Sequence, residues 1–113
     1  MRTSSAKAKG RRACQDVQTL LYKYAPQLLP GDIEVTSSGV TGEDLKLSPA
    51  ARQQYPFVIE CKNQEKINIW ASIDQAKTHV KGDLIPLLFF KRNRSDLMVC
   101  LPAEEFFKLL EKK

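Results

Sequence analysis

The feature that most constrains the fold is a short apolar segment, residues 56–62, that carries two charges. Its composition predicts a strand, in which alternate side chains share a face. Glu60 and Lys62 then share one side of the strand, opposite Ile59. Burying either charge without a partner costs several kcal/mol, on the order of the stability of a whole small domain. The fold therefore has to bring partners to this strand.

A second acidic group precedes this strand at the distance of a hairpin. Gly42-Glu43-Asp44 opens a predicted strand, and residues 48–55 connect it to the charged strand through a stretch with room for one helical turn. Asp44 and Glu60 would then lie on adjacent strands. A lone Glu-x-Lys pattern is usually a solvated face or an ion pair, but the preceding acid and the apolar surroundings favour a reactive site.

These side chains suit the metal-dependent cleavage of a phosphodiester bond. That chemistry needs a hard dication, an oriented water and a group that neutralises the charge developing on the phosphate. Asp44 and Glu60 would hold Mg²⁺, with Mn²⁺ as a substitute, and the main-chain carbonyl of Cys61 is a further candidate ligand. Lys62 would orient the water and stabilise the transition state.

The net charge of +5 is unevenly distributed along the chain. The first twelve residues contain no acid, and their basic residues are Arg2, Lys7, Lys9, Arg11 and Arg12. A basic arm that leads into a helix is typical of nucleic-acid binding, and a solubilising tail is an equal alternative. A second basic group closes a predicted buried strand and suits a phosphate-contacting rim or a solvated loop. It consists of Lys91, Arg92 and Arg94.

The length of 113 residues predicts a single domain, residues 10–113, after a flexible basic arm, residues 1–9. No apolar run approaches the roughly 20 residues that span a bilayer, and no signal-peptide core follows the N-terminus. A cytoplasmic protein without membrane contact is expected. Cys14, Cys61 and Cys100 lack a Cys-x-x-Cys pair and predict buried, reduced thiols. With one histidine in the chain, a zinc site is disfavoured.

The hydrophobic spacing predicts the order α-β-β-β-α-β-β-α. Helices are expected over residues 10–24, 70–80 and from 102 onward, and strands over 32–36, 43–47, 57–62, 84–90 and 97–101. The strand over 57–62 is expected to be central. The last helix is apolar over too wide an arc for a peripheral helix, which indicates core packing or a dimer interface.

Gly42-Glu43-Asp44 followed by Ile59-Glu60-Cys61-Lys62 resembles the motif of the PD-(D/E)XK nuclease superfamily. Two other segments resemble small Holliday-junction resolvases of archaeal and phage type: Lys9-Gly10-Arg11-Arg12 and Ser37-Ser38-Gly39. Three segments resemble small phage-encoded nucleases in particular: Leu47-Ser48-Pro49-Ala50-Ala51-Arg52, Glu60-Cys61-Lys62-Asn63-Gln64-Glu65 and Lys91-Arg92-Asn93-Arg94. The resemblance implies an α/β, restriction-endonuclease-like fold, a central mixed sheet of about five strands flanked by helices. It also implies a magnesium-dependent endonuclease that acts as a homodimer on four-way or branched DNA, in the host cytoplasm if it is phage-encoded.

One position departs from the pattern of those resolvases. They carry a glutamate in the first helix, four residues after the glycine, and here Cys14 occupies that position. Either the two other acids suffice, or Gln15 replaces the glutamate by a shift of register, or activity is weak. Ser37 and Ser38 would bind phosphate or build a turn. Gln75 would point at the site or at DNA, or be an ordinary exposed side chain.

The sequence is also compatible with two functions that do not involve catalysis. The cysteine in the acidic position allows a non-catalytic DNA-binding module on a nuclease fold. A structural domain in which Glu60 and Lys62 simply pair is a third interpretation. Among nucleases, linear duplexes, flaps and nicked DNA are alternative substrates, because these residues determine the cleavage chemistry better than the shape of the DNA.

Overall fold

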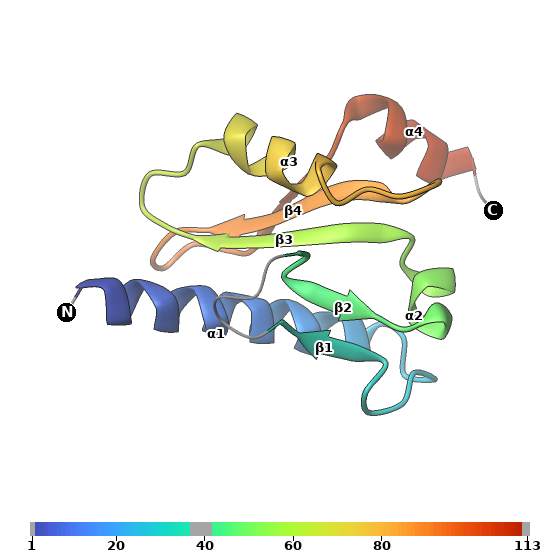
Figure 1. Cartoon of the computed structure of the whole chain (residues 1–113), viewed down its shortest axis with the longest axis horizontal. Helices are drawn as coiled ribbons and strands as arrows, with labels where there is room; N and C mark the ends of the chain where they lie inside the picture. The colour runs from blue at the N-terminus through green and yellow to red at the C-terminus, as the bar shows by residue number, and fades with distance from the viewer. Residues whose placement is uncertain (1, 37–41, 112–113) are drawn as a thin grey trace.

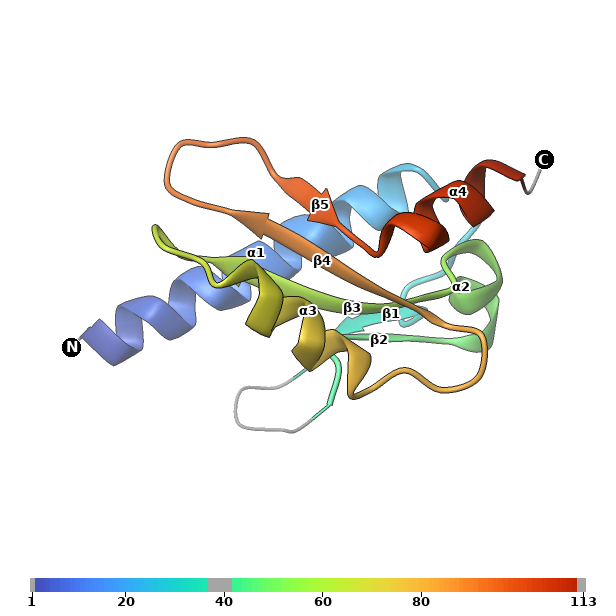
Figure 2. The ribbon, with the colours of Figure 1, turned by 90° about the horizontal axis from the view of Figure 1, so that it is seen from above.

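The computed structural model describes residues 2–36 and 42–111, which form both helices and strands (Figures 1 and 2). Within those residues the elements are α1 (Arg2–Lys23), β1 (Ile33–Val35), β2 (Leu45–Leu47), α2 (Pro49–Gln54), β3 (Phe57–Asn63), α3 (Ile69–Lys77), β4 (Ile85–Lys91), β5 (Met98–Cys100) and α4 (Ala103–Glu111). This α/β order agrees with the predicted one, except that the connector between β2 and β3 forms a separate short helix, α2.

The strands of the described residues form two adjoining sheets. β1 and β2 pair antiparallel, whereas β3 pairs parallel with β4, and β4 antiparallel with β5. β2 lies beside β3 (Figure 1), but Asp44 bridges them: its N–H donates to Ile59 (3.2 Å) and its carboxylate accepts from the Cys61 N–H (2.7 Å). A side chain thus takes the place of the strand carbonyl that would continue the ladder. At this position the predicted five-stranded sheet is divided into sheets of two and three strands.

β3 is covered on both faces, by α1 on one side and α3 on the other (Figure 1). Ile59 and Cys61 belong to the main core, together with Val17 of α1. Because side chains alternate along a strand, Glu60 points to the opposite face, which α3 covers with the buried Ile73. Strands that are covered on both faces need apolar residues on both faces. Glu60 is an acidic residue at such a covered position of β3.

The first helix begins earlier than the sequence predicts. A flexible arm was expected over residues 1–9 and a helix from Gly10, whereas α1 is helical from Arg2. Alanine and lysine residues before Gly10 are among the best helix formers, and they outweigh the roughly 1 kcal/mol that a glycine costs in a helix interior. The basic residues of this segment are therefore carried on a helix.

The last helix does not pack into the core of its own chain. None of the residues in α4 is buried, and the side chains of Phe106, Phe107 and Leu110 are 46%, 59% and 51% exposed. The rings of Phe106 and Phe107 contact each other edge to face, with centroids 5.2 Å apart. Core packing, one of the two expectations for this wide apolar arc, is therefore wrong. No helix among the described residues has the length and apolar character that crossing a bilayer requires.

Ser48 fixes the start of α2 and connects it to the segment before β1. Its Oγ accepts a hydrogen bond from the Ala51 N–H (3.1 Å) and donates one to Asp32 Oδ1 (2.7 Å). Replacing an N-cap serine by alanine costs about 1 kcal/mol. We therefore expect Ser48→Ala to lower the free energy of unfolding by about 1–2 kcal/mol in urea denaturation, because the second bond is lost as well. Gln53→Ala, at an exposed position of α2, is the control and should change it by less than about 0.5 kcal/mol. Equal effects of the two substitutions would contradict the role of the cap.

Candidate functional site

Asp44 stands at the entrance to β2, where neighbours fix both its main chain and its side chain. Its C=O accepts a hydrogen bond from the Thr36 N–H (2.9 Å), and its N–H donates to the Ile59 C=O (3.2 Å). Its Oδ2 accepts from the Cys61 N–H (2.7 Å). Because the N–H and C=O of a strand residue point to the same edge, the Cys61 carbonyl also faces β2. Two of the predicted oxygen ligands, the Asp44 carboxylate and the Cys61 carbonyl, therefore lie along one edge of β3.

Glu60 is a buried acid in the middle of β3. Its side chain is 1% exposed, and neither carboxylate oxygen has a hydrogen-bond partner among the residues that the structure describes. Burial is the main cause that raises the pKa of Glu60 to about 8. The neighbouring Asp44 carboxyl raises it further, by its charge and by accepting a hydrogen bond from the protonated form of Glu60, while the charge of Lys62 opposes the shift. A buried carboxylate without partners costs several kcal/mol. This position therefore requires a proton or a bound cation.

Lys62 lies on the same face of β3 as Glu60, near the end of the strand. It is partly exposed, so its ammonium group has access to solvent while its charge acts on the Glu60 carboxyl. Of the three residues that the sequence singled out, Asp44 and Lys62 thus both act on the carboxyl group of the third, Glu60. Asn63 follows, and its side-chain oxygen is also buried without a partner among the described residues.

An ion pair that could not be predicted from the sequence lies next to Asp44. Arg52 of α2 binds the Glu43 carboxylate with one nitrogen, at 2.8 and 2.7 Å from its two oxygens. Another guanidinium nitrogen of Arg52 donates to the main-chain carbonyl of Phe57. The chain on either side of the site, next to Asp44 and at the start of β3, is therefore held by one side chain. Neither residue has a spacing that would have indicated this contact.

Cys14, in the position where a glutamate was expected, faces the candidate site. The Sγ atoms of Cys14 and Cys61 and a carboxylate oxygen of Asp44 all lie within 4.8 Å of one another. Both cysteines are free and buried. Contact with the Cys14 thiol, followed by burial, raises the pKa of Cys61 well above its ordinary value. Sequence reasoning missed this group because α1 and β3 meet only in the folded chain.

The auxiliary residues named from the sequence do not join the carboxylates. Gln15 is exposed on α1, next to the buried Cys14, because neighbouring helix residues point about 100° apart. Gln75 is exposed on α3, whose buried residues are Ser72, Ile73 and Ala76. Ser37 and Ser38 lie outside the described residues. The structure therefore supports Cys14, and not Gln15, as the side chain from α1 that reaches Asp44.

The two basic groups lie at the same end of the molecule. Figures 1 and 2 place the N-terminal half of α1 and the turn between β4 and β5 at the end where β3 and β4 finish. Four of their side chains are exposed and the other two are partly exposed: Arg11, Arg12, Arg92 and Arg94, and Lys9 and Lys91. The turn is rigidly built, since the Arg92 N–H donates to Ser95 Oγ (3.0 Å) and the Asn93 N–H to Glu65 (2.6 Å). Arg94 adopts a left-handed conformation, φ 63°, which is uncommon for a non-glycine residue.

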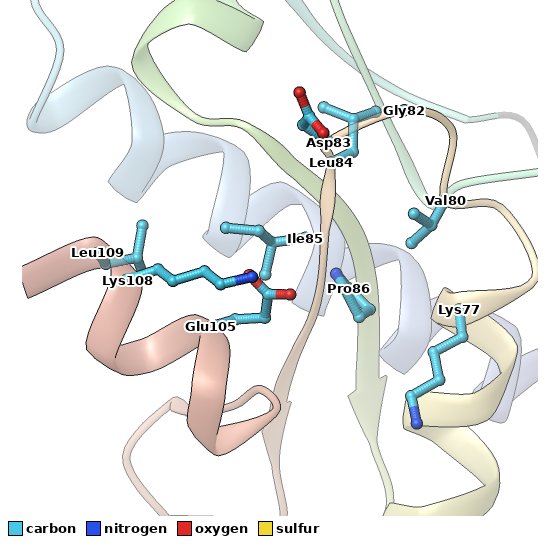
Figure 3. Close-up of a pocket in the computed structure, with 10 residues that line it drawn as sticks. All are labelled: Lys77, Val80, Gly82, Asp83, Leu84, Ile85, Pro86, Glu105, Lys108 and Leu109. Carbon is cyan, nitrogen blue, oxygen red and sulfur yellow. The ribbon is translucent and has the colours of Figure 1, made fainter. Parts of the chain in front are cut away.

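A cleft of about 540 Å³ lies elsewhere, between the C-terminal end of α3, the start of β4 and α4 (Figure 3). Its lining includes Lys77, Asp83, Glu105 and Lys108, which mix both signs of charge. Asp44, Glu60 and Lys62 are not part of this lining. The candidate site is therefore distinct from this cleft and is centred on the boundary between the two sheets.

The arrangement around β3 provides oxygen donors for a hard cation, one ammonium group, and a basic surface at the same end of the molecule. Comparison of the chain with models of protein families, with curated proteins and with solved structures finds no match. The functional conclusion consequently depends on the chemistry of these residues.

Proposed function

We propose that this protein is a magnesium-dependent endodeoxyribonuclease of the PD-(D/E)XK type that nicks four-way or branched DNA. The observation that carries the proposal is the Glu60 carboxylate, which is buried without a hydrogen-bond partner among the described residues and adjoins Asp44 and Lys62. A protein that needed only a stable strand would gain from an apolar residue in this place. A carboxylate at this buried position destabilises the fold, and the binding of a cation would account for its presence.

The donor set fits Mg²⁺. This ion prefers oxygen ligands and is usually bound by one or two carboxylates plus waters and substrate phosphates. Asp44 and Glu60 supply the carboxylates, and the Cys61 carbonyl faces the same edge of β3 as Asp44. When bound, a divalent cation supplies Lewis-acid activation of the phosphate and of the attacking water. Mn²⁺ has the same preference for oxygen ligands and should substitute for it.

The protein's own residues would do the rest of the work. Lys62, on the face of Glu60 and with access to solvent, would donate hydrogen bonds that orient the attacking water and offset the negative charge of the transition state. Asp44 is held by three main-chain contacts, so its carboxylate is positioned before substrate arrives. Arg52 would keep this geometry through Glu43. Such preorganisation is what electrostatic catalysis requires.

The basic end of the molecule supports DNA as the substrate. Arg11 and Arg12 on α1 are exposed, and so are Arg92 and Arg94 in the turn after β4. The N-terminal half of α1 and this turn lie at the end of the molecule where β3 and β4 finish (Figure 2). Arginine suits phosphate because its donors match two phosphate oxygens at once. Branched DNA and the homodimer follow from the resemblance to resolvases: a two-fold dimer has paired sites that can nick two symmetry-related strands.

One cleavage assay tests the proposal. A synthetic four-way junction and the matching linear duplex are incubated with the protein in Mg²⁺ or in EDTA. We expect nicking of the junction in Mg²⁺ only, and a loss of at least about 100-fold in Asp44→Asn and in Lys62→Ala. Lys66→Ala, an exposed lysine just after β3, is the matched control and should cleave normally. Tight junction binding without cleavage in any divalent metal would leave a DNA-binding module as the function.

A further inference from the structure

The side of Asp44 that faces α1 brings together a second set of donor atoms. Cys14 Sγ, Cys61 Sγ and a carboxylate oxygen of Asp44 are all within 4.8 Å of one another. A tetrahedral zinc ion binds sulfur at about 2.3 Å and carboxylate oxygen at about 2.0–2.2 Å, so ligands of one ion are roughly 3.5–4 Å apart. The three atoms are therefore near enough to hold one ion with small side-chain rotations.

These donors prefer a different class of metal from the oxygen ligands around Glu60. Thiolates are soft ligands that select Zn²⁺ and similar thiophilic ions, whereas Mg²⁺ prefers carboxylates, carbonyls and water. Because side chains alternate along β3, Cys61 points to the face that α1 covers and Glu60 to the other. Asp44 lies at the edge of the strand, where it is within reach of both.

Both cysteines of this donor set belong to the hydrophobic core. Cys14 lies between Ala13 and Val17 on the buried stripe of α1, and Cys61 is part of the same core. Asp44 is fixed by its hydrogen bond from the Cys61 N–H (2.7 Å). A dication that enters would replace the two thiol protons, which leave to solvent, and would leave one coordination position for water. No rearrangement of the backbone is needed to bring the ligands together.

We propose that Cys14, Asp44 and Cys61 form a binding site for a thiophilic dication such as Zn²⁺ or Cd²⁺, and that its occupation withdraws Asp44 from the magnesium site. The first half depends only on the three side chains. The second half rests on the proposed nuclease function, and it predicts that zinc inhibits cleavage even when Mg²⁺ is in excess.

Binding is tested on the reduced full-length chain by titration with Cd²⁺, followed through the ultraviolet charge-transfer absorption of cadmium–thiolate bonds. We expect one Cd²⁺ per chain, with displacement by Zn²⁺. Cys14→Ser should lose most of the absorption, and Asp44→Asn should keep it with an affinity at least about tenfold lower. Cys100→Ser, a cysteine outside the group, should titrate like the wild type. Circular dichroism verifies that each variant is folded. Equal titrations of Cys14→Ser and wild type would overturn the site.

Inhibition is tested in the cleavage assay with Mg²⁺ in excess. One equivalent of Zn²⁺ per chain should lower junction cleavage by at least about tenfold in the wild type and in Cys100→Ser. Cys14→Ser should keep the rate that it has without zinc. Equal inhibition of all three proteins would show that zinc acts elsewhere and would overturn the link to Asp44. If the protein does not cleave DNA at all, the cadmium titration still decides whether the thiol site exists, so the two proposals fail separately.

Discussion

Glu60→Gln should abolish magnesium-dependent cleavage and, at the same time, make the metal-free protein more stable at alkaline pH. Cleavage is expected to fall by roughly 10²–10³-fold or more, because an amide is a poor substitute for a charged ligand. The free energy of unfolding at pH 9 is expected to rise by about 2–4 kcal/mol. Above its pKa of about 8, the Glu60 side chain of the wild type is a buried anion without hydrogen-bond partners among the described residues. Glutamine has a similar shape and no charge.

The expected gain is smaller than the whole cost of the charge. Holding the anion at this buried position beside Asp44 costs on the order of 5 kcal/mol, since a pKa raised from 4.5 to about 8 corresponds to about 1.4 kcal/mol per unit. The amide of glutamine is also polar, and leaving it without partners costs about 1–3 kcal/mol. The difference between these two costs gives about 2–4 kcal/mol. At pH 5 the wild-type side chain is already protonated in the folded state, so the glutamine variant should no longer be more stable than the wild type.

Urea denaturation at pH 5 and pH 9 in EDTA measures this difference, and the junction assay measures the activity. Glu34→Gln is the matched control, because Glu34 is an exposed strand glutamate, and it should change neither quantity. A destabilised Glu60→Gln at pH 9 would mean that Glu60 has a structural partner, as in the interpretation in which Glu60 and Lys62 simply pair. Stabilisation with unchanged cleavage would remove Glu60 from the active site.

Local spacing was sufficient to locate the strand and the charges at the centre of this fold. β3 was expected over residues 57–62 and extends over Phe57–Asn63, because alternating apolar residues leave few other conformations open. The proximity of Asp44 to Glu60 and Lys62 could also be predicted from the sequence, because two consecutive strands separated by a short connection lie side by side. Contacts within a strand and between consecutive strands can be predicted because few arrangements of them are possible.

Contacts between distant segments could not be predicted in this way. The meeting of Cys14 with Cys61, and the grip of Arg52 on Glu43, depend on how α1 and α2 pack against the sheets. The two sheets adjoin where the Asp44 side chain, and not a main-chain carbonyl, accepts a hydrogen bond from Cys61. The basic, polar composition of the segment before Gly10 is typical of a flexible arm. Its alanine and lysine residues nevertheless favour the helix that forms.

In the absence of divalent metal, the wild-type protein should lose stability as the pH rises from about 4.5 to about 8, by an amount on the order of 5 kcal/mol relative to Glu60→Gln. The pKa of Glu60 is higher in the folded than in the unfolded chain, so the folded state holds more protons within this range. Its contribution is therefore fully present below the ordinary pKa of 4.5 and is lost as the pH rises through 8. The lowered pKa of Asp32 acts in the opposite direction and only at more acidic pH, near and below 3.8.

Magnesium should restore this stability, and more so at pH 8.5 than at pH 5.5, because protons and the cation compete for the same carboxylates. A ligand at 100 times its dissociation constant stabilises a folded protein by about 2.7 kcal/mol. Thermal unfolding with and without Mg²⁺ at the two pH values measures the effect, and Asp44→Asn and Glu60→Gln should both lack it. Above pH 9 the raised pKa of Cys61 adds a separate loss of stability, so no measurement goes above that value. A magnesium effect that is equal at both pH values, or that persists in Glu60→Gln, would show that the cation binds away from Glu60, and the buried carboxylate would then have to be explained by its proton alone.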